Sequence, residues 1–542
     1  MSVFNPTQKP EVRFQPEVWR SFQRGIHKIV DAVAPTLGPR PRYVAIQPTH
    51  RADPPELLDD AGQIARRIIQ IADRDEDVGA MFTRQMLWRL REEVGDGAAT
   101  AAVLFKAVYN EALKYIVAGG GAMRVRVGLE QALDVALTAL DKQVQRLDEK
   151  NDLKQFARSL CPDESVADLL GEIFNLIGAD GHLITQLGRG FASEREYVEG
   201  HLWGGGLLAR NLMLEPQRQR SRLENAALLI TDLEIESASQ LTPALRVALE
   251  NGEKNLVIVA RKLSEEAAAL LVKINRDSDQ MRVTAVKTPG TGTTDQSAAL
   301  EDLSALAGGR VILQVEGQML ETVSAESFGR ARRAWADMER VVIVNGKGEP
   351  RALRGHIQSI RHAIQHADTP EQRNKLRERI GRLQGGAAIL SIGGATETEM
   401  KTRRDSAERA ALILRSALRE GVVNGGGISL LDCRPALESV SHTILDEDQR
   451  AGFRALTKAL DAPARLILTN SGFDPSGFLT HLGQGRGVDA RAGQLVEMRS
   501  AGIVDPAASA RGALISAVRG AALALTVDVV VHKRNPQASV NP

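Results

Sequence analysis

The 542-residue sequence is poor in several features that mark specialised protein classes. It has two cysteines, Cys161 and Cys433, which are too few and too far apart for a disulfide framework or a zinc cluster. Aromatic residues make up only 4%, so a base-stacking surface for nucleic acid is not expected. The net charge is +1, which gives no electrostatic reason to bind nucleic acid or an anionic membrane.

Long apolar runs are also missing. No stretch approaches 18 uninterrupted apolar residues, and the first residues lack the basic-then-apolar layout of a signal peptide. We therefore expect a cytoplasmic protein with no membrane partner, and the cysteine content fits that reducing compartment. The length and the 43% hydrophobic content predict a globular chain of about three domains.

The spacing of apolar residues changes along the chain. Residues 18–33 and most of the first 140 residues repeat at helical spacing. From about 198 to 384, short apolar runs alternate with helical segments, which predicts an inserted α/β domain. The expected strands include 228–230, 256–259, 283–286, 311–313 and 341–344. Helical spacing then returns, so a mostly helical domain is expected from both chain ends.

The turn Gly95-Asp96-Gly97 leads directly into an apolar helical run. Glycines let the backbone approach a ligand closely, and the free N–H groups at a helix start bind phosphate. The Asp96 carboxylate is a suitable ligand for Mg²⁺. A plain connecting turn is the alternative, because short turns of this kind are common.

Motifs in a fixed order carry a family resemblance across essentially the whole chain. They are TLGP at 36–39, VGDGAAT at 94–100, GGATETEMK at 393–401, EGVVNGGG at 420–427 and AGIVDP at 501–506. In this order they resemble the group I chaperonins, the GroEL type, and the chain is identified as a divergent member of that family.

The resemblance implies a multidomain α/β subunit with the chaperonin fold. A mostly helical equatorial domain that binds ATP would comprise 1–142 and 420–542, and a small intermediate hinge domain would comprise 143–197 and 385–419. An inserted α/β apical domain, 198–384, would bind substrate. Family subunits assemble with copies of themselves into seven-membered rings, single or paired, that enclose non-native polypeptides. A co-chaperonin partner is left open.

The resemblance also places an ATP site with Mg²⁺, and it leaves K⁺ open as a further ion. Asp96 would hold Mg²⁺, and Asp60 is retained as a catalytic carboxylate. The residues implied to contact the nucleotide are Thr36, Leu37, Gly38, Pro39, Asp96, Gly97, Ala98, Ala99, Thr100, Gly425, Gly426, Asp489, Ala490, Ile503 and Asp505.

Departures from the family pattern lie in this site. Ala98 and Ala99 stand where the family has threonines, and each lost hydroxyl removes a bond to phosphate of about 1.5–3 kcal/mol. Asp59 aligns with a family lysine near the phosphates, and a carboxylate there would repel phosphate. Arg409 aligns with the hydrolytic aspartate of the family, and arginine cannot accept a proton.

We therefore expect a site that binds ATP and hydrolyses it slowly or not at all. Two alternatives stay open for Arg409. Its side chain points to solvent while another carboxylate serves, or it pairs with Asp405, which lies one turn earlier on the same helix face.

The family grips unfolded chains with apolar side chains of the apical domain. The aligned residues here are Leu207, Leu212, Leu245, Ala267, Leu271 and Val272. Packing in the apical core is the alternative for each of them, because apolar residues also form the face of a helix that packs against the core.

Two functions from different classes follow from the sequence. The first is an ATP-dependent folding chaperone that forms rings, with impaired hydrolysis. The second is a non-hydrolysing chaperonin-like scaffold or holdase that co-assembles with an active paralogue. A small-molecule enzyme finds no support, because no nucleophile–base set is evident in the sequence.

Overall fold

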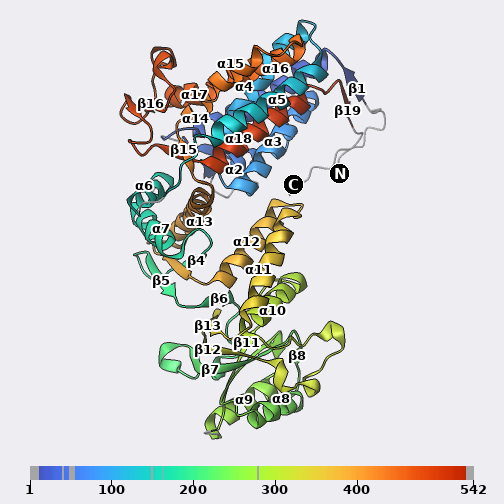
Figure 1. Ribbon diagram of the computed structural model, residues 1–542, viewed down its shortest axis with the longest axis vertical. Helices are drawn as coiled ribbons and strands as arrows, with labels where there is room; N and C mark the ends of the chain where they lie inside the picture. Colours follow the sequence, from blue (N-terminus) through green and yellow to red (C-terminus); the bar gives the residue numbers. More distant parts are fainter. Residues whose placement is uncertain are drawn as a thin grey trace. The chain divides into compact units, whose positions relative to one another are not determined.

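The computed structural model describes residues 11–39, 42–47, 55–147, 150–161, 163–277 and 280–532. The chain divides into two compact units (Figure 1). Unit 1 comprises Met1–Gly171 and Ser406–Pro542, and unit 2 comprises Glu172–Asp405. Both chain ends therefore belong to unit 1. The finer division into three domains stays a prediction.

Unit 1 is mainly helical. Its helices are α1 (Glu17–Val33), α2 (Ala61–Arg67), α3 (Arg74–Val94), α4 (Ala98–Val117), α5 (Ala122–Asp141), α6 (Lys150–Leu160), α14 (Ile428–Leu431), α15 (Arg434–Ser441), α16 (Glu447–Ala459), α17 (Ala462–Asn470) and α18 (Ala507–Ala524). Two more, α7 (Glu164–Ile177) and α13 (Glu397–Glu420), run through the points where the chain passes between the units.

The strands of unit 1 form short two-stranded pairs. They are β1 (Glu11–Phe14) with β19 (Val529–His532), β2 (Val44–Ile46) with β3 (Glu56–Leu58), β15 (Val422–Asn424) with β18 (Val504–Pro506), and β16 (Arg486–Asp489) with β17 (Gln494–Glu497). All four pairs are antiparallel. The β1–β19 pair joins the two halves of the unit, whereas both strands of the β15–β18 pair come from its second half.

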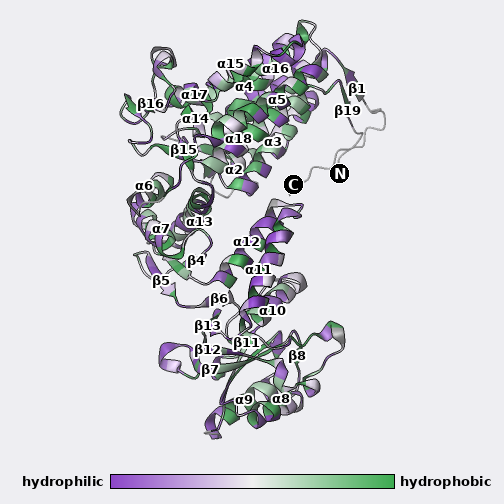
Figure 2. Cartoon of the chain, viewed as in Figure 1, coloured by the Kyte–Doolittle hydropathy of each residue, from purple (hydrophilic) through white to green (hydrophobic). Residues whose placement is uncertain are grey.

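The core of unit 1 lies between α1, α3, α4, α5, α16 and α18, on which Figure 2 shows hydrophobic residues in green beside hydrophilic residues in purple. Small residues let these helices approach closely. A Cβ atom on Gly25 of α1 would lie 1.9 Å from the Glu76 carbonyl oxygen of α3. One on Gly128 of α5 would lie 2.1 Å from the Gln449 carbonyl oxygen of α16. Only glycine fits at these two crossings, so the helix spacing depends on them.

Unit 2 has the predicted α/β composition. Its helices are α8 (Ala238–Glu250), α9 (Glu265–Asp277), α10 (Thr293–Ala307), α11 (Pro350–Gln365) and α12 (Pro370–Gln384). Its strands are β4 (His182–Leu187), β5 (Glu194–Val198), β6 (His201–Gly204), β7 (Ser221–Ile230), β8 (Glu234–Ile235), β9 (Asn255–Ala260), β10 (Lys262–Leu263), β11 (Arg282–Lys287), β12 (Phe328–Ala336), β13 (Arg340–Gly346) and β14 (Ala387–Ile392).

A six-stranded sheet organises unit 2, in the order β11-β9-β7-β12-β13-β6. Strands β7, β9 and β11 are parallel, and β12, β13 and β6 are antiparallel to their neighbours. Alternate side chains of the parallel strands point to opposite faces. One face packs against α8 and α9 and the other against α10, α11 and α12 (Figure 1). This double cover explains the continuous apolar runs of these strands.

Four of the five strand predictions named above are confirmed, because 228–230, 256–259, 283–286 and 341–344 lie in β7, β9, β11 and β13. The fifth, 311–313, was wrong. There the chain makes only one isolated bridge, between Thr231 and Ile312.

A smaller sheet, β4-β14-β5, has β14 in its centre. Strand β14 is parallel to β4 and antiparallel to β5. Two short 3₁₀ helices, η2 (Arg210–Leu212) and η3 (Pro216–Arg218), lie in the segment that precedes β7.

A buried carboxylate ties α10, α11 and α12 together. Asp302 of α10 has no exposed side-chain surface. It accepts hydrogen bonds from Arg379 of α12 at 2.7 and 3.0 Å, and its Oδ1 lies 2.7 Å from Nε2 of His356 on α11. A charge withdrawn from water needs such partners, so these contacts fix how the three helices pack.

Two sequence expectations concern features of the fold itself. Cys161 and Cys433 are both free and buried, and burial raises the pKa of Cys433 to about 12. Within the part of the chain that the structure describes, no helix combines the length and the apolar character that a bilayer crossing requires.

Candidate phosphate and nucleotide site

The helix start predicted to bind phosphate is formed as expected. Helix α3 ends at Gly95 (φ 83°), and α4 begins directly after Gly97 (φ 87°). A Cβ atom on Gly97 would lie 2.9 Å from the Ser509 carbonyl oxygen of α18, so this position requires glycine for two reasons. The first N–H groups of the 20-residue α4 have no partner within the helix, which is the arrangement that binds anions.

Two carboxylates, those of Asp96 and Asp505, lie at this turn. The side chains of Asp96 and Asp505 reach solvent, yet the surrounding protein raises the pKa of both groups by burial. For Asp505 this burial, together with the charge of Asp96, raises the pKa to about 7. The nearby Asp60 carboxylate raises the pKa of Asp96 further, although the Gly97 N–H opposes the rise. These carboxylates therefore repel one another, and a bound cation would reduce the repulsion.

Asp60 is held firmly at the start of α2. Its Oδ1 accepts a hydrogen bond from the Gln63 N–H at 2.8 Å and caps the helix. Its two carboxylate oxygens also lie 3.0 and 3.1 Å from Nε of Arg91 on α3. Only 10% of the Asp60 side chain is exposed, so these contacts fix its position.

Arg409 of α13 points at the same carboxylates. Its Nη1 lies 3.6 Å from Oδ1 of Asp59 and 3.5 Å from Oδ2 of Asp60. The positive charge of Arg409 also opposes the rise of the Asp96 pKa. Arg409 therefore pairs with Asp59 and Asp60, whereas Asp405, its expected partner, pairs with Arg404. Which carboxylate serves in hydrolysis stays a prediction.

The loop predicted to wrap the phosphates is anchored on α17. The Asn470 side-chain amide donates to the Ala34 carbonyl at 2.9 Å and to the Leu37 carbonyl at 2.8 Å. The Thr36 hydroxyl donates to the Val33 carbonyl at 2.8 Å, which leaves it no free proton for a phosphate. Gly38 adopts a φ of 118° and Pro39 is exposed, so the backbone of the loop remains accessible.

The residues predicted to contact ribose and base meet at the β15–β18 pair. The Gly425 N–H donates to the Ile503 carbonyl at 3.0 Å. A Cβ atom on Gly425 would lie 3.2 Å from Oδ1 of Asp505, and Gly426 adopts a φ of 65°. Ile503 packs against a small apolar cluster that includes Met498. Gly425, Ile503 and Asp505 are thus brought together as predicted.

Asp489 and Ala490 lie at the end of β16. Asp489 accepts the Arg491 and Ala492 N–H groups at 2.8 and 3.3 Å, so its carboxylate shapes its own turn. Ala490 is buried. Their contact with a base stays a prediction.

On α4 the substituted positions differ in exposure. Ala98 is buried, whereas Ala99 and Thr100 are partly exposed. A threonine hydroxyl at position 99 would therefore have room to contact a ligand. A threonine at position 98 would place its hydroxyl among buried apolar side chains.

The apical residues require a correction. Leu207, Leu212, Leu245, Ala267 and Leu271 are buried in the two cores of unit 2, and only Val272 is partly exposed. The inward faces of α8 and α9 pack against the sheet, and they include Leu245, Ala267 and Leu271. Core packing, the alternative left open by the sequence, is what the structure shows for these five.

Several residues at the site were missed by sequence reasoning. They are Arg91, which binds Asp60, Asn470, which anchors the 36–39 loop, and Ser509, which lies beside Gly97 and Asp96. The position of Ser509 in the first turn after the AGIVDP motif was a usable signal. Arg91 and Asn470 carry no such signal, because their roles depend on how α3 and α17 pack.

The described residues hold no group of three or more His, Cys, Asp or Glu side chains placed to bind a metal ion without other ligands. Mg²⁺ commonly binds through one or two carboxylates together with the phosphates of a substrate. Asp96 beside the start of α4 fits that pattern.

Known proteins share the fold described above. The model of the TCP-1/cpn60 chaperonin family matches residues 29–535. Two crystal structures of the chaperonin gp146 from the bacteriophage EL 2 (Pseudomonas aeruginosa), determined in the presence of ATP-BeFx, match with TM-scores of 0.63 and 0.68. Each match covers 97% of this chain and 99% of gp146 at 19% identity. At this identity the likeness shows the fold.

Proposed function

The chain belongs to the TCP-1/cpn60 chaperonin family, and we propose that it is a subunit that binds ATP with Mg²⁺ and assists non-native polypeptides. One observation carries the nucleotide part of this proposal. Asp60, Asp96 and Asp505 come from three separate segments of the chain. The charge of Asp60 raises the pKa of Asp96, and the charge of Asp96 raises the pKa of Asp505, so a cation bound beside the start of α4 would offset this repulsion.

The residues present fit a nucleotide with its metal ion. Asp96 would hold Mg²⁺, and the first N–H groups of α4 with Thr100 would bind phosphate. Asp505 would accept a hydrogen bond from the ribose, and Gly425 and Ile503 would border the base. Hydrolysis of the terminal phosphate would supply free energy for a change in subunit conformation. The presence of ATP-BeFx in the gp146 crystals supports this proposal.

We infer that hydrolysis is slow, because the retained carboxylate is already engaged. Asp60 caps α2, bonds to Arg91 and lies 3.5 Å from Arg409. A carboxylate held by a hydrogen bond from one guanidinium group and an ion pair with a second has little freedom to orient a water molecule. Arg409 cannot substitute for it as a proton acceptor. The same arrangement favours the second function, a holdase or scaffold that binds nucleotide without turning it over.

Assembly and location follow from the family as proposals. The subunit would form seven-membered rings in the cytoplasm, single or paired, with or without an active paralogue and a co-chaperonin. Native mass spectrometry of the purified chain tests the ring, and a population of monomers alone would contradict it.

Phosphate release with MgATP separates the two functions. Turnover well above background that Asp60→Ala abolishes would exclude the non-hydrolysing scaffold. Nucleotide binding without turnover, combined with suppression of client aggregation, would support the holdase. Calorimetric titration with ATP and Mg²⁺ tests the shared premise, and an absence of binding would remove both.

A further inference from the structure

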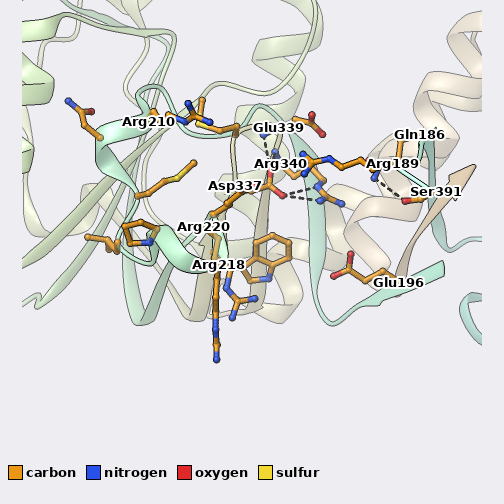
Figure 3. Close-up of a pocket in the computed structure, with 18 of the residues that line it drawn as sticks. Gln186, Arg189, Glu196, Arg210, Arg218, Arg220, Asp337, Glu339, Arg340 and Ser391 are labelled. Atoms are coloured by element: carbon orange, nitrogen blue, oxygen red, sulfur yellow. Dashed lines mark hydrogen bonds and ion pairs between the residues drawn. The ribbon is translucent and has the colours of Figure 1, made fainter. Parts of the chain in front are cut away.

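Unit 2 contains a large cleft, of about 1670 Å³, that the nucleotide site does not use. One wall is the end of β4 with the 188–190 loop, and another is the segment around η2 and η3. The C-terminal part of α9 and the 335–340 turn between β12 and β13 complete it (Figure 3). Its volume exceeds the range of about 300–1,000 Å³ that is typical of small-molecule pockets.

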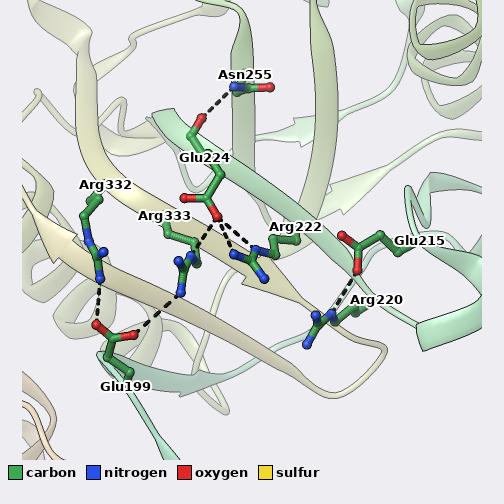
Figure 4. Close-up of polar contacts among 8 residues, drawn as sticks. All are labelled: Glu199, Glu215, Arg220, Arg222, Glu224, Asn255, Arg332 and Arg333. Atoms are coloured by element: carbon green, nitrogen blue, oxygen red, sulfur yellow. Dashed lines mark hydrogen bonds and ion pairs between the residues drawn. The ribbon is translucent and has the colours of Figure 1, made fainter.

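Arginine dominates the charge of this cleft. The lining holds seven arginines, namely Arg189, Arg210, Arg218, Arg220, Arg276, Arg282 and Arg340. Arg220 pairs with Glu215 at 3.1 Å and Arg340 pairs with Asp337 at 2.9 Å (Figures 3 and 4). The other five side chains are on exposed residues and make no ion pair among the residues that the structure describes.

The sheet beside the cleft shows that unpaired arginines are not the rule in unit 2. Arg222 of β7 and Arg333 of β12 both bind Glu224, at 2.7 and 2.8 Å, and Arg332 binds Glu199 at 2.6 Å (Figure 4). Arg222 pairs with a carboxylate of its own strand, and Arg333 and Arg332 pair with carboxylates of a neighbouring strand and a turn. The five cleft arginines lack such partners, which leaves their guanidinium groups available to a ligand.

The excess of positive charge is local. The whole chain has a net charge of only +1, whereas seven guanidinium groups in the cleft face four carboxylates, those of Glu194, Glu196, Asp337 and Glu339. A concave protein surface concentrates the field of such charges. Guanidinium groups bind carboxylates through paired hydrogen bonds, with more specificity than a point charge.

The lining also has an apolar part. Met213, Leu214, Val272, Trp335 and Met338 contribute to the walls between the arginines. Val272 is the one predicted apical contact residue that is not in the core. Spaced carboxylates with apolar side chains between them therefore match the cleft. A continuous phosphate backbone matches it less well, because it would meet the lining carboxylates along its length.

We propose that this cleft binds acidic, partly apolar segments of non-native polypeptides. That the partner is a non-native polypeptide rests on the proposed function. The cleft would serve as the contact surface in place of the apical residues that are buried. Arg189, Arg210, Arg218, Arg276 and Arg282 supply the carboxylate contacts, and the apolar lining contacts the side chains between the acids.

Fluorescence anisotropy with the full-length chain tests the proposal. The probe is a labelled peptide of alternating glutamate and leucine, and its control has glutamine at every glutamate. We expect the glutamate peptide to bind about tenfold more tightly at low salt, and the difference to shrink as added salt screens the charges. Equal binding of the two peptides would overturn the proposal.

Variants of the cleft then locate the contact. The triple variant Arg210→Gln, Arg218→Gln, Arg276→Gln should weaken binding of the glutamate peptide about tenfold, because each exposed charge pair adds a modest amount. The corresponding lysine variant should lose less, since it keeps the charge and loses only the paired geometry. The matched control changes three exposed arginines of α11 to glutamine, Arg351, Arg354 and Arg361, and should bind as the wild type does.

Thermal unfolding of each variant checks that it is folded. If the glutamine variant does not fold, the lysine variant supplies the test. Unchanged binding by the glutamine variant, or an equal loss in the α11 control, would overturn the assignment. Tighter binding of inorganic polyphosphate or a single-stranded oligonucleotide than of the glutamate peptide would overturn the choice of ligand. The peptide titrations contain no nucleotide, so peptide binding by a chain that fails to bind ATP would refute only the nucleotide function. ATP binding without peptide binding would refute only the cleft.

Discussion

Arg409 and Asp59 form an ion pair, with Nη1 of the arginine 3.6 Å from Oδ1 of the aspartate. By resemblance to the group I chaperonins, an aspartate is expected in place of Arg409 and a lysine in place of Asp59. The resemblance thus implies that the charges at these two positions are exchanged in this chain. The exchange keeps the local net charge while it places the cation against Asp60.

Restoring the family polarity should raise turnover. In the double variant Asp59→Lys, Arg409→Asp, the new carboxylate can orient water and Asp60 loses one of its guanidinium partners. General-base catalysis contributes about 10²–10⁴ in rate, so we expect phosphate release to rise about a hundredfold over the wild type. Steady-state phosphate release with saturating MgATP measures this.

The single variants are the controls for the exchange. Arg409→Asp alone leaves Asp59, Asp60 and Asp96 close together without that cation, so it should be less stable than the double variant. A double-mutant cycle on the unfolding midpoint isolates the pair, for which we expect a coupling of about 0.2–1 kcal/mol. A single variant that is as active and as stable as the double variant would contradict the exchange.

The parts of the site that local sequence determines could be predicted. Gly95 and Gly97 fix the turn between α3 and α4 through their positive φ values, and this places Asp96 at the helix start. The strands β7, β9 and β13 were recognisable as continuous apolar runs, because helices cover both faces of their sheet. Strand β12 escaped notice because its sequence, FGRARRAWA, alternates small or apolar residues with arginine.

The other parts of the fold and of the site depend on tertiary packing, which a local sequence pattern does not predict. The apolar spacing of α9 identifies a buried face, but it does not say whether Leu271 meets the core or a client. The arginines of the cleft are far apart in sequence, from Arg189 to Arg340, and only the strand order of unit 2 brings them together. The contact of Arg409 with Asp59 likewise requires the position of α13 beside α2.

Ala99→Thr should strengthen nucleotide binding. Position 99 is partly exposed at the start of α4, so a hydroxyl there can bond to a charged phosphate. Such a bond contributes about 1.5–3 kcal/mol, which corresponds to an affinity gain of about tenfold or more. Ala99→Val adds a similar volume without the hydroxyl and serves as the matched control. Calorimetric titration with MgATP compares them, and equal affinities of the threonine and valine variants would refute a phosphate contact at this position.

The stability of nucleotide-free unit 1 should fall as the pH rises from about 4 towards 7. The pKa of Asp505 is about 7 in the folded chain, against an ordinary value of 3.8 for an aspartate, which we take for the unfolded chain. Between these values the folded state binds more protons than the unfolded state, so raising the pH favours unfolding. Asp505→Asn should remove this part of the slope, and Asp134→Asn, which alters an exposed carboxylate of α5, should keep it. Hydrogen exchange of α4 and α18 peptides across this pH range measures the effect. A wild-type slope in Asp505→Asn would show that another group causes it.

Asp302→Ala should strongly destabilise unit 2. The substitution leaves Arg379 and His356 facing a buried space without their carboxylate partner. Removing one member of a buried pair costs about 3–5 kcal/mol, because the remaining charge stays desolvated. Glu378→Ala is the matched control, since it removes the exposed partner of Arg382 on the same helix, α12, and should cost about 1 kcal/mol or less. Urea-dependent hydrogen exchange of α10 and α12 peptides in the full chain reports both losses. Similar losses in the two variants would mean that Asp302 does not hold the three helices together, and that apolar packing alone sets their arrangement.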